Sequence, residues 1–193
     1  MNSGQMMLVV GAFTMLSILA LSFNRTMFNS MTLGLEMEAT LNAISIASSM
    51  MDEIMSKDFD EEVTGGRRAY EFTDVTLPAN LGTDTGESIS GTDSSYWNGS
   101  AFTDFASKLT FDDIDDYSGY TRQVRDPRLG IFTVLDSVHY CDETSPSTML
   151  GTRTFFKQVT VYVSHPNLPK ASMDDAESLP LIIRDLAIYR RFF

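Results

Sequence analysis

The sequence predicts an α+β protein in which one long N-terminal helix packs on a C-terminal antiparallel β-sheet head. Residues 6–23 carry no charge, and apolar residues then recur three or four positions apart as far as residue 56. After residue 130, three segments have the composition of strands. We therefore divide the chain into a short leader at 1–4, a helix at 5–56 and a globular β head at 57–193.

The first part of the helix, residues 5–23, is long enough to approach the thickness of a membrane. Eighteen uncharged residues rise about 27 Å, against about 30 Å for a bilayer core. The segment is apolar all round, unlike the one-sided surface helix of a soluble protein. No basic region precedes it and no small-residue cleavage site follows Phe23, so an ordinary secretory signal is disfavoured. We predict a transmembrane or filament-core helix that includes Met6, Met7, Leu8, Val9, Phe13, Leu16, Leu19 and Phe23.

The second part of the helix, residues 24–56, is predicted to be amphipathic. Polar residues fill the positions between the apolar ones, so one face should pack on the head. Asn24 and Gly34 are weak helix formers. They either cause a bend or melted turn within residues 22–34 or are surface residues that the helix tolerates. The apolar residues predicted to face the head are Phe28, Met31, Leu35, Met37, Leu41, Ile44, Ala47, Met51 and Ile54.

Three strand candidates, at 131–140, 154–163 and 181–190, predict a sheet of three or four antiparallel strands. Alternation in the second candidate places Val159, Val161 and Val163 on one face. The stretch at about 78–107 is rich in Gly, Ser, Thr and Asp and predicts an exposed loop.

Two further groups of residues are candidates for contacts between subunits. Tyr96 and Trp97 form an aromatic pair that could serve as a subunit contact or could pin the loop to the head. Three arginines spaced three apart could pair with acidic neighbours or could be scattered solubilising residues; they are Arg122, Arg125 and Arg128.

Charge and composition exclude several classes of function. The chain has 26 acidic against 14 basic residues, a net charge of -12, which argues against a nucleic-acid partner. The single cysteine, Cys141, excludes an internal disulfide and any multi-cysteine metal site. His139 could share a strand face with Cys141, but the sequence offers this pair no orienting partner. We therefore predict that the protein is not an enzyme.

Four carboxylates in five residues are the most distinctive motif of the head. Asp112, Asp113, Asp115 and Asp116 repel one another unless they are solvated, paired or bridged by a cation. The spacing is not that of an EF-hand loop. Two interpretations stay open: a calcium site, or a solvated turn before the first strand. Apart from this candidate calcium, no cofactor is expected.

Several of these segments together resemble a known family. A short leader ending in Gly4, the uncharged span from Gln5 and the helix end at 47–61 resemble a type IV pilin or pseudopilin precursor. The helix end is similar to those of V-type minor pilins and type II secretion pseudopilins. The segment Asp-Asp-Ile-Asp-Asp-Tyr-Ser-Gly at 112–119 resembles mannose-sensitive haemagglutinin-type minor pilins, and the alternating strand at 157–163 is common in pilin heads.

The resemblance implies a processing site and a function. Gly4 would precede the prepilin peptidase cut, and Gln5 would be the mature, N-methylated first residue. Val9 stands where the family typically has a glutamate, and the leader has no Lys or Arg. The implied function is a structural subunit of a pilus-like or secretion filament, with itself and other pilin-like subunits as partners. Such a subunit is held in the inner membrane before it joins an extracellular filament or periplasmic pseudopilus. The alternative is a single-pass, membrane-anchored adhesin or calcium-dependent binding domain.

Overall fold

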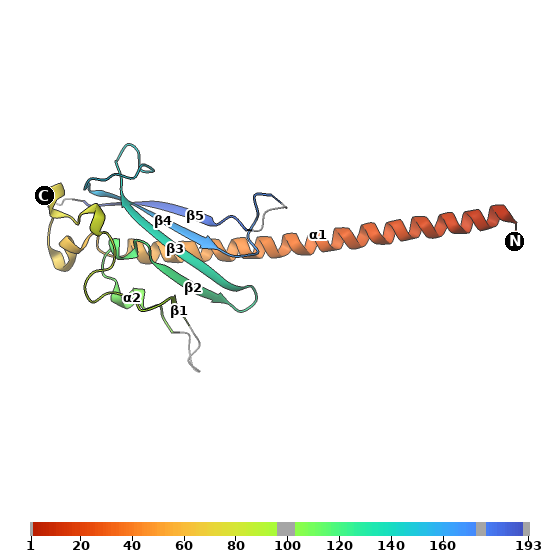
Figure 1. The fold of residues 1–193 in the computed structure, drawn as a ribbon, viewed down its shortest axis with the longest axis horizontal. Helices are drawn as coiled ribbons and strands as arrows, with labels where there is room; N and C mark the ends of the chain where they lie inside the picture. The colour runs from red at the N-terminus through yellow and green to blue at the C-terminus, as the bar shows by residue number, and fades with distance from the viewer. Residues whose placement is uncertain (1, 96–102, 173–176, 191–193) are drawn as a thin grey trace. The chain divides into compact units, whose positions relative to one another are not determined.

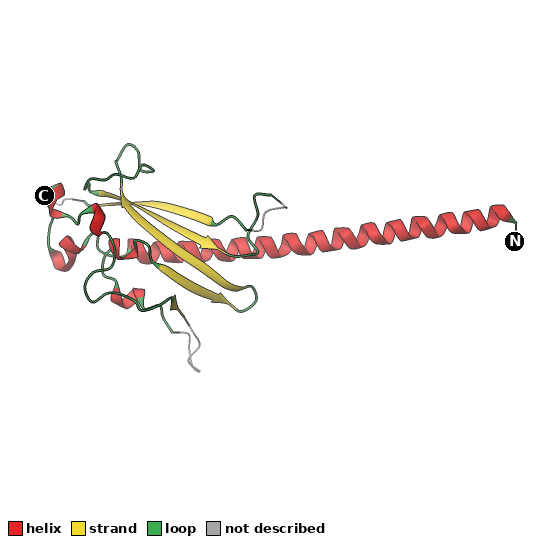
Figure 2. Ribbon diagram, in the orientation of Figure 1, coloured by secondary structure: helices red, strands yellow, loops and turns green. Residues whose placement is uncertain are grey.

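The computed structural model describes residues 2–95, 103–172 and 177–190. It shows an α+β protein in which a long helix, α1 (Ser3–Met55), supplies one wall of a core whose other wall is a five-stranded mixed sheet. The chain divides into two compact units, residues 1–38 and residues 39–193. Figures 1 and 2 show the elements of each unit.

Residues 3–38 of the first unit are helical throughout and belong to α1. The helix is unbroken through residues 22–34, so the melted turn that Asn24 and Gly34 could have caused is absent from this described segment. The predicted helix, 5–56, agrees with the observed bounds within two residues at its start and one at its end.

The sheet of the second unit has the strand order β1-β2-β3-β4-β5. Its strands are β1 (Asp93–Ser94), β2 (Thr121–Asp126), β3 (Gly130–Tyr140), β4 (Phe156–Ser164) and β5 (Leu181–Ile188). The strands from β2 to β5 pair antiparallel with their neighbours in chain order, whereas β1 pairs parallel with β2. The purely antiparallel prediction was therefore wrong at β1, and β2 was not predicted.

A short hairpin joins β2 to β3. The Asp126 side chain accepts hydrogen bonds from the backbone N–H groups of Arg128 (2.7 Å) and Leu129 (2.8 Å). Gly130 closes the turn at φ +101°, a conformation that residues with a Cβ rarely adopt. This three-residue loop fixes the register in which Arg122 lies opposite Val134.

Short helical turns connect the end of α1 to the sheet. They are η1 (Glu61–Gly66), η2 (Phe72–Asp74), η3 (Pro78–Asn80), α2 (Ser107–Thr110) and η4 (Asp115–Tyr117). The predicted exposed loop at about 78–107 thus contains η3 and β1, and Asp93 within it is 6% exposed.

The core of the second unit lies between the last turns of α1 and one face of the sheet, with the strands crossing the helix as in Figure 1. The helix contributes a narrow stripe whose first members are alanines, and small side chains let a helix lie close to its neighbour. The sheet contributes Phe132, Val134 and Val138 from β3, and the predicted row Val159, Val161 and Val163 from β4 is fully buried. The buried helix residues are Ala39, Ala43, Ala47, Met50, Met51 and Ile54.

The helix face predicted to pack on the head was partly wrong. Leu41 and Ile44 are 66% and 42% exposed, whereas Ala39 and Ala43 are fully buried. Met51, Ile54 and Ala47 are buried as predicted. The larger apolar residues from Phe28 to Met37 are also exposed. Between residues 28 and 44 the core therefore uses the alanine face and leaves the bulky apolar residues uncovered, and larger side chains become buried in it only from Met50 onward.

Candidate functional site

The acidic segment 112–116 is held against the end of α1 by backbone hydrogen bonds. The N–H of Asp58 donates to the carbonyl of Asp112 (3.1 Å), and the N–H of Ile114 donates to the carbonyl of Asp58 (2.9 Å). This bridge brings the residues that follow the helix beside η4. The segment is therefore not a solvated turn, because Asp113, Asp115 and Asp116 are each 1% exposed.

The buried ammonium of Lys157 joins three segments that are distant in sequence. Its Nζ donates to the carbonyl of Phe59 (2.7 Å) and lies 2.8 Å from carboxylate oxygens of both Asp60 and Asp115. The three protons of the ammonium thus have three acceptors, which is the condition for burying a lysine. Tyr140 adds a hydrogen bond from its hydroxyl to Asp60 (2.9 Å).

The two carboxylates at Lys157 have unequal environments. Burial by itself raises the pKa of Asp60, but the charge of Lys157 and hydrogen bonds from Thr76 outweigh it and hold that pKa below its usual value. For Asp115 burial is the larger effect and raises the pKa, against the opposing charge of Lys157. Lys157 thus favours the charged form of Asp60 more than that of Asp115, although both carboxylates lie at the same distance from it.

Asp113 and Asp116 also belong to a second acidic group. Carboxylate oxygens of Asp84, Asp113 and Glu61 lie within 4.8 Å of one another, and so do those of Asp84, Asp116 and Glu87. We call these five residues the acidic cluster. Asp84 belongs to both trios and is exposed, so the cluster opens to solvent on its side.

Mutual repulsion and burial make the fully ionised state of the acidic cluster unfavourable when no counter-ion is bound. Burial, together with the charge of Asp115, raises the pKa of Asp113 to about 9. Burial and the charge of Asp116 raise the pKa of Glu87 to about 7, and burial also raises the pKa of Asp116. The cluster therefore favours either bound protons or a cation.

The four aspartates predicted as one calcium site are divided by the structure. Asp113 and Asp116 join the acidic cluster, Asp115 pairs with Lys157, and Asp112 is exposed. Sequence reasoning missed Glu61, Asp84 and Glu87, which come from η1 and the loop after η3. The run of aspartates at 112–116 identifies only one of the segments that form the acidic cluster, and it contributes two of the five members, Asp113 and Asp116.

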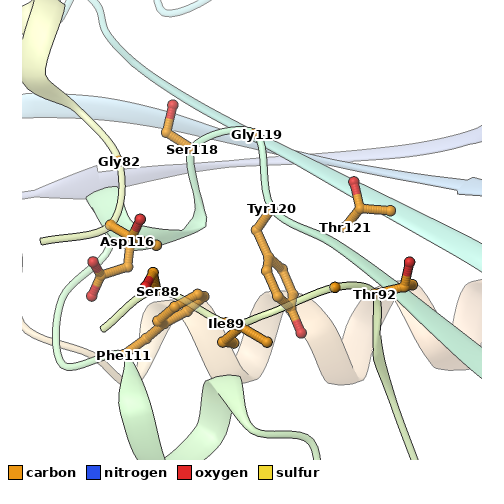
Figure 3. A pocket seen from close by; sticks show the side chains of 12 residues that line it. Gly82, Ser88, Ile89, Thr92, Phe111, Asp116, Ser118, Gly119, Tyr120 and Thr121 are labelled. Atoms are coloured by element: carbon orange, nitrogen blue, oxygen red, sulfur yellow. The ribbon is translucent and has the colours of Figure 1, made fainter. Parts of the chain in front are cut away.

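A cleft of about 410 Å³ borders the acidic cluster on the side of β2 (Figure 3). Asp116 lies at its edge beside Gly82 and Ser88, and the rings of Phe111 and Tyr120 line it. Gly119 has φ +79° in the turn that leads from η4 to β2. The cleft shows that solvent reaches the neighbourhood of Asp116.

A separate buried network connects α1 to β2. Arg122 donates from Nη1 to a carboxylate oxygen of Glu53 (2.7 Å), and the hydroxyls of Ser107 and Tyr117 donate to the other Glu53 oxygen (3.0 and 3.1 Å). Arg122 is 2% exposed and stacks over Phe105. It is therefore an internal residue, and the prediction of a contact between subunits was wrong for it; Arg125 and Arg128 are exposed.

The residues predicted to form a filament core lie on α1 with their side chains exposed. An 18-residue window of this helix has a mean hydropathy of 2.2 and is 0% buried, long and apolar enough to cross a membrane. Gly4 and Gln5 are exposed residues in the first turns of α1. The exposed members are Met6, Met7, Leu8, Val9, Phe13, Leu16, Leu19 and Phe23.

Two remaining predictions concern aromatic and thiol residues. Tyr96 and Trp97, the candidate contact pair, lie outside the described residues. Cys141 is a buried free thiol, and burial raises its pKa, which lowers its reactivity as a nucleophile.

Comparisons with protein-family models, with curated proteins and with solved structures found no match for this chain.

Proposed function

We propose that the protein is a structural subunit of a type IV pilus-like or secretion filament, assembled through its N-terminal helix. In this proposal the chain is held in the inner membrane before assembly. It is cleaved between Gly4 and Gln5, and it then packs against copies of itself and other pilin-like subunits. The protein then belongs to a surface filament or a periplasmic pseudopilus.

The length of uncovered apolar surface on α1 supports the proposal best. A membrane span needs about 20 apolar residues. Large apolar side chains of α1 stay exposed from Met6 to Ile44, roughly twice that number of residues. A lipid bilayer can cover only the first half. The exposed residues beyond it, Met37, Leu41 and Ile44 among them, suit helix-to-helix packing between subunits.

Substitution on this exposed face tests the proposal. Leu41 and Ile44 have exposed side chains, so the double variant Leu41→Gln with Ile44→Gln should leave the sheet domain folded. In native cells it should reduce the amount of this chain in sheared surface filaments or isolated pseudopili by at least about tenfold. That reduction corresponds to a loss of about 1.4 kcal/mol in the free energy of assembly. Electron microscopy and quantitative blotting of the sheared material measure this.

Met149→Gln provides the matched control, because Met149 is 70% exposed and lies on the connection between β3 and β4. This variant should assemble like the unmodified chain. Mass analysis of the native protein should find Gln5 as its first residue. A chain that keeps its leader, stays in the membrane fraction and never enters filaments would instead support the anchored binding domain.

A further inference from the structure

We propose that the acidic cluster binds a calcium ion, with Asp84 as the shared ligand and Asp113, Asp116 and Glu87 completing the protein's oxygen donors. The ion would join the loop after η3, which carries Asp84 and Glu87, to the segment 113–116 that leads into η4. The inference is independent of filament assembly and holds or fails on the second compact unit alone.

The geometry gathers enough oxygen donors for one hard cation. The two trios of oxygens, each within 4.8 Å, share Asp84 and therefore form one continuous group. Calcium accepts six to eight oxygens at about 2.3–2.6 Å, and carboxylates bind it with one or both oxygens. Glu61 is left out of the proposed ligand set, since it also lies 3.6 Å from the exposed guanidinium of Arg67.

Buried oxygens without partners give a second, independent indication of a ligand. Asp113 uses Oδ1 to accept from the N–H of Asp116, and Asp116 uses Oδ2 to accept from the N–H of Asp112. The remaining oxygens, Oδ2 of Asp113 and Oδ1 of Asp116, have no hydrogen-bond partner within the described residues, although each side chain is 1% exposed. One oxygen of Glu87, whose side chain is half-buried, also has no hydrogen-bond partner within the described residues. Buried carboxylate oxygens are rarely left unpaired, because each loses its hydration without compensation.

The arrangement favours calcium over the other common divalent ions. Neither trio contains histidine or cysteine, which zinc and most transition metals prefer. Magnesium demands a near-octahedral shell at about 2.1 Å and keeps several waters. A group in which two members lie on the loop after η3, one on η4 and one just before it tolerates the longer and more variable distances of calcium.

Thermal unfolding of the detergent-solubilised full chain tests the proposal, with CaCl₂ as the ligand and EGTA as its chelator. Calcium at about ten times its Kd should raise the midpoint by about 3–6 °C. MgCl₂ at the same concentration should give less than half of this rise. Isothermal titration of the same sample with CaCl₂ should show saturable binding.

Asp84→Asn is the sharpest variant because Asp84 is exposed and belongs to both trios. It should fold with an unchanged midpoint in EGTA and should lose the calcium-dependent rise. Glu87→Gln should weaken calcium binding by about tenfold or more, and Glu143→Gln, an exposed acidic residue elsewhere, should leave it unchanged. An EGTA-treated chain that responds to neither calcium nor chelator would overturn the proposal. So would an Asp84→Asn chain that keeps the full rise, or an equal response to magnesium.

Discussion

At the residue scale, the inner face of the sheet carries three charged side chains with different partners. Register places Arg122 opposite Val134, Asp136 opposite Val161 and Lys157 opposite Tyr140, all toward the core. Arg122 pairs with Glu53 and Lys157 with Asp60. Neither carboxylate oxygen of Asp136 has a hydrogen-bond partner in the described part of the chain. Burial raises the pKa of Asp136 to about 8, opposed by Arg122 and reinforced by Glu53.

The raised pKa of Asp136 predicts a pH-dependent stability. In an unfolded chain an aspartate titrates near 3.9, so between about pH 4 and 8 the folded state holds a proton that the unfolded state has released. Rising pH therefore lowers the free energy of unfolding through this window, by up to about 1.4 kcal/mol per pH unit from this group. Asp136→Asn should remove that slope and make the protein more stable than the unmodified chain at pH 8, with the advantage vanishing toward pH 4.

Urea unfolding in detergent at several pH values, followed by near-ultraviolet circular dichroism, measures the difference. Asp185→Asn is the control, because Asp185 is exposed on β5 and its change should not alter the slope. Identical pH profiles for Asp136→Asn and the unmodified chain would contradict the assignment.

At the element scale, the helix α1 was predicted correctly, but the face with which it packs on the sheet was predicted incorrectly. The helix has apolar residues on more than one face, and periodicity favoured the bulky ones. The sheet instead packs on Ala39, Ala43 and Ala47. Buried polar contacts lie at the end of the same helix, where Glu53 meets Arg122. Hydrophobicity alone does not rank two apolar faces, since the choice depends on the space that the partner sheet leaves.

Substituting each face distinguishes the two arrangements. Ala43→Leu places a large side chain into a position that is fully buried and should lower the free energy of unfolding by about 1–3 kcal/mol. Leu41→Ala removes a side chain that is 66% exposed and should change it by less than about 0.5 kcal/mol. Were Leu41 in the core, as its spacing suggested, the second change would cost about 2–5 kcal/mol. Urea unfolding of both variants decides between the two.

The strand β2 shows what local pattern could not reveal. Its sequence, Thr121 to Asp126, contains one aliphatic residue and two arginines, so it lacks the alternation that marked β3 and β4. Its inward arginine is tolerated because Glu53 of α1 neutralises it. The hairpin signal was present in Asp126 and Gly130, four residues apart around a proline.

At the scale of the whole molecule, the two compact units differ in the surroundings that their apolar side chains need. Every buried residue of α1 lies at or after Ala39, within the second unit. Residues 2–38 contribute no buried side chain. The second unit therefore contains the complete described core, and the first unit needs lipid, detergent or other subunits to cover its apolar side chains.

A chain that begins at Leu35 should consequently fold without detergent. It keeps one helical turn before Ala39 and all the buried residues of α1, so it should unfold cooperatively with a midpoint close to that of the full chain in detergent. Circular dichroism during thermal unfolding measures this. A chain that begins at Ser48 is the control: it lacks Ala39, Ala43 and Ala47, uncovers the valines of β4 and should lose the transition. Equal behaviour of the two truncations would contradict this division of the core.

The long apolar helix, the strands β3 to β5 and the crowded aspartates were readable from the sequence, because hydrophobic period, β-branched alternation and charge density are local properties. The packing face of α1, the strand β2 and the partners of each aspartate were decided only by the tertiary structure. Glu61 and Asp84 are 52 and 29 residues away from Asp113 in sequence, and nothing local distinguishes them from other surface acids. They meet Asp113 because η1 and the loop after η3 fold back over η4, where burial turns scattered charges into a single electrostatic group.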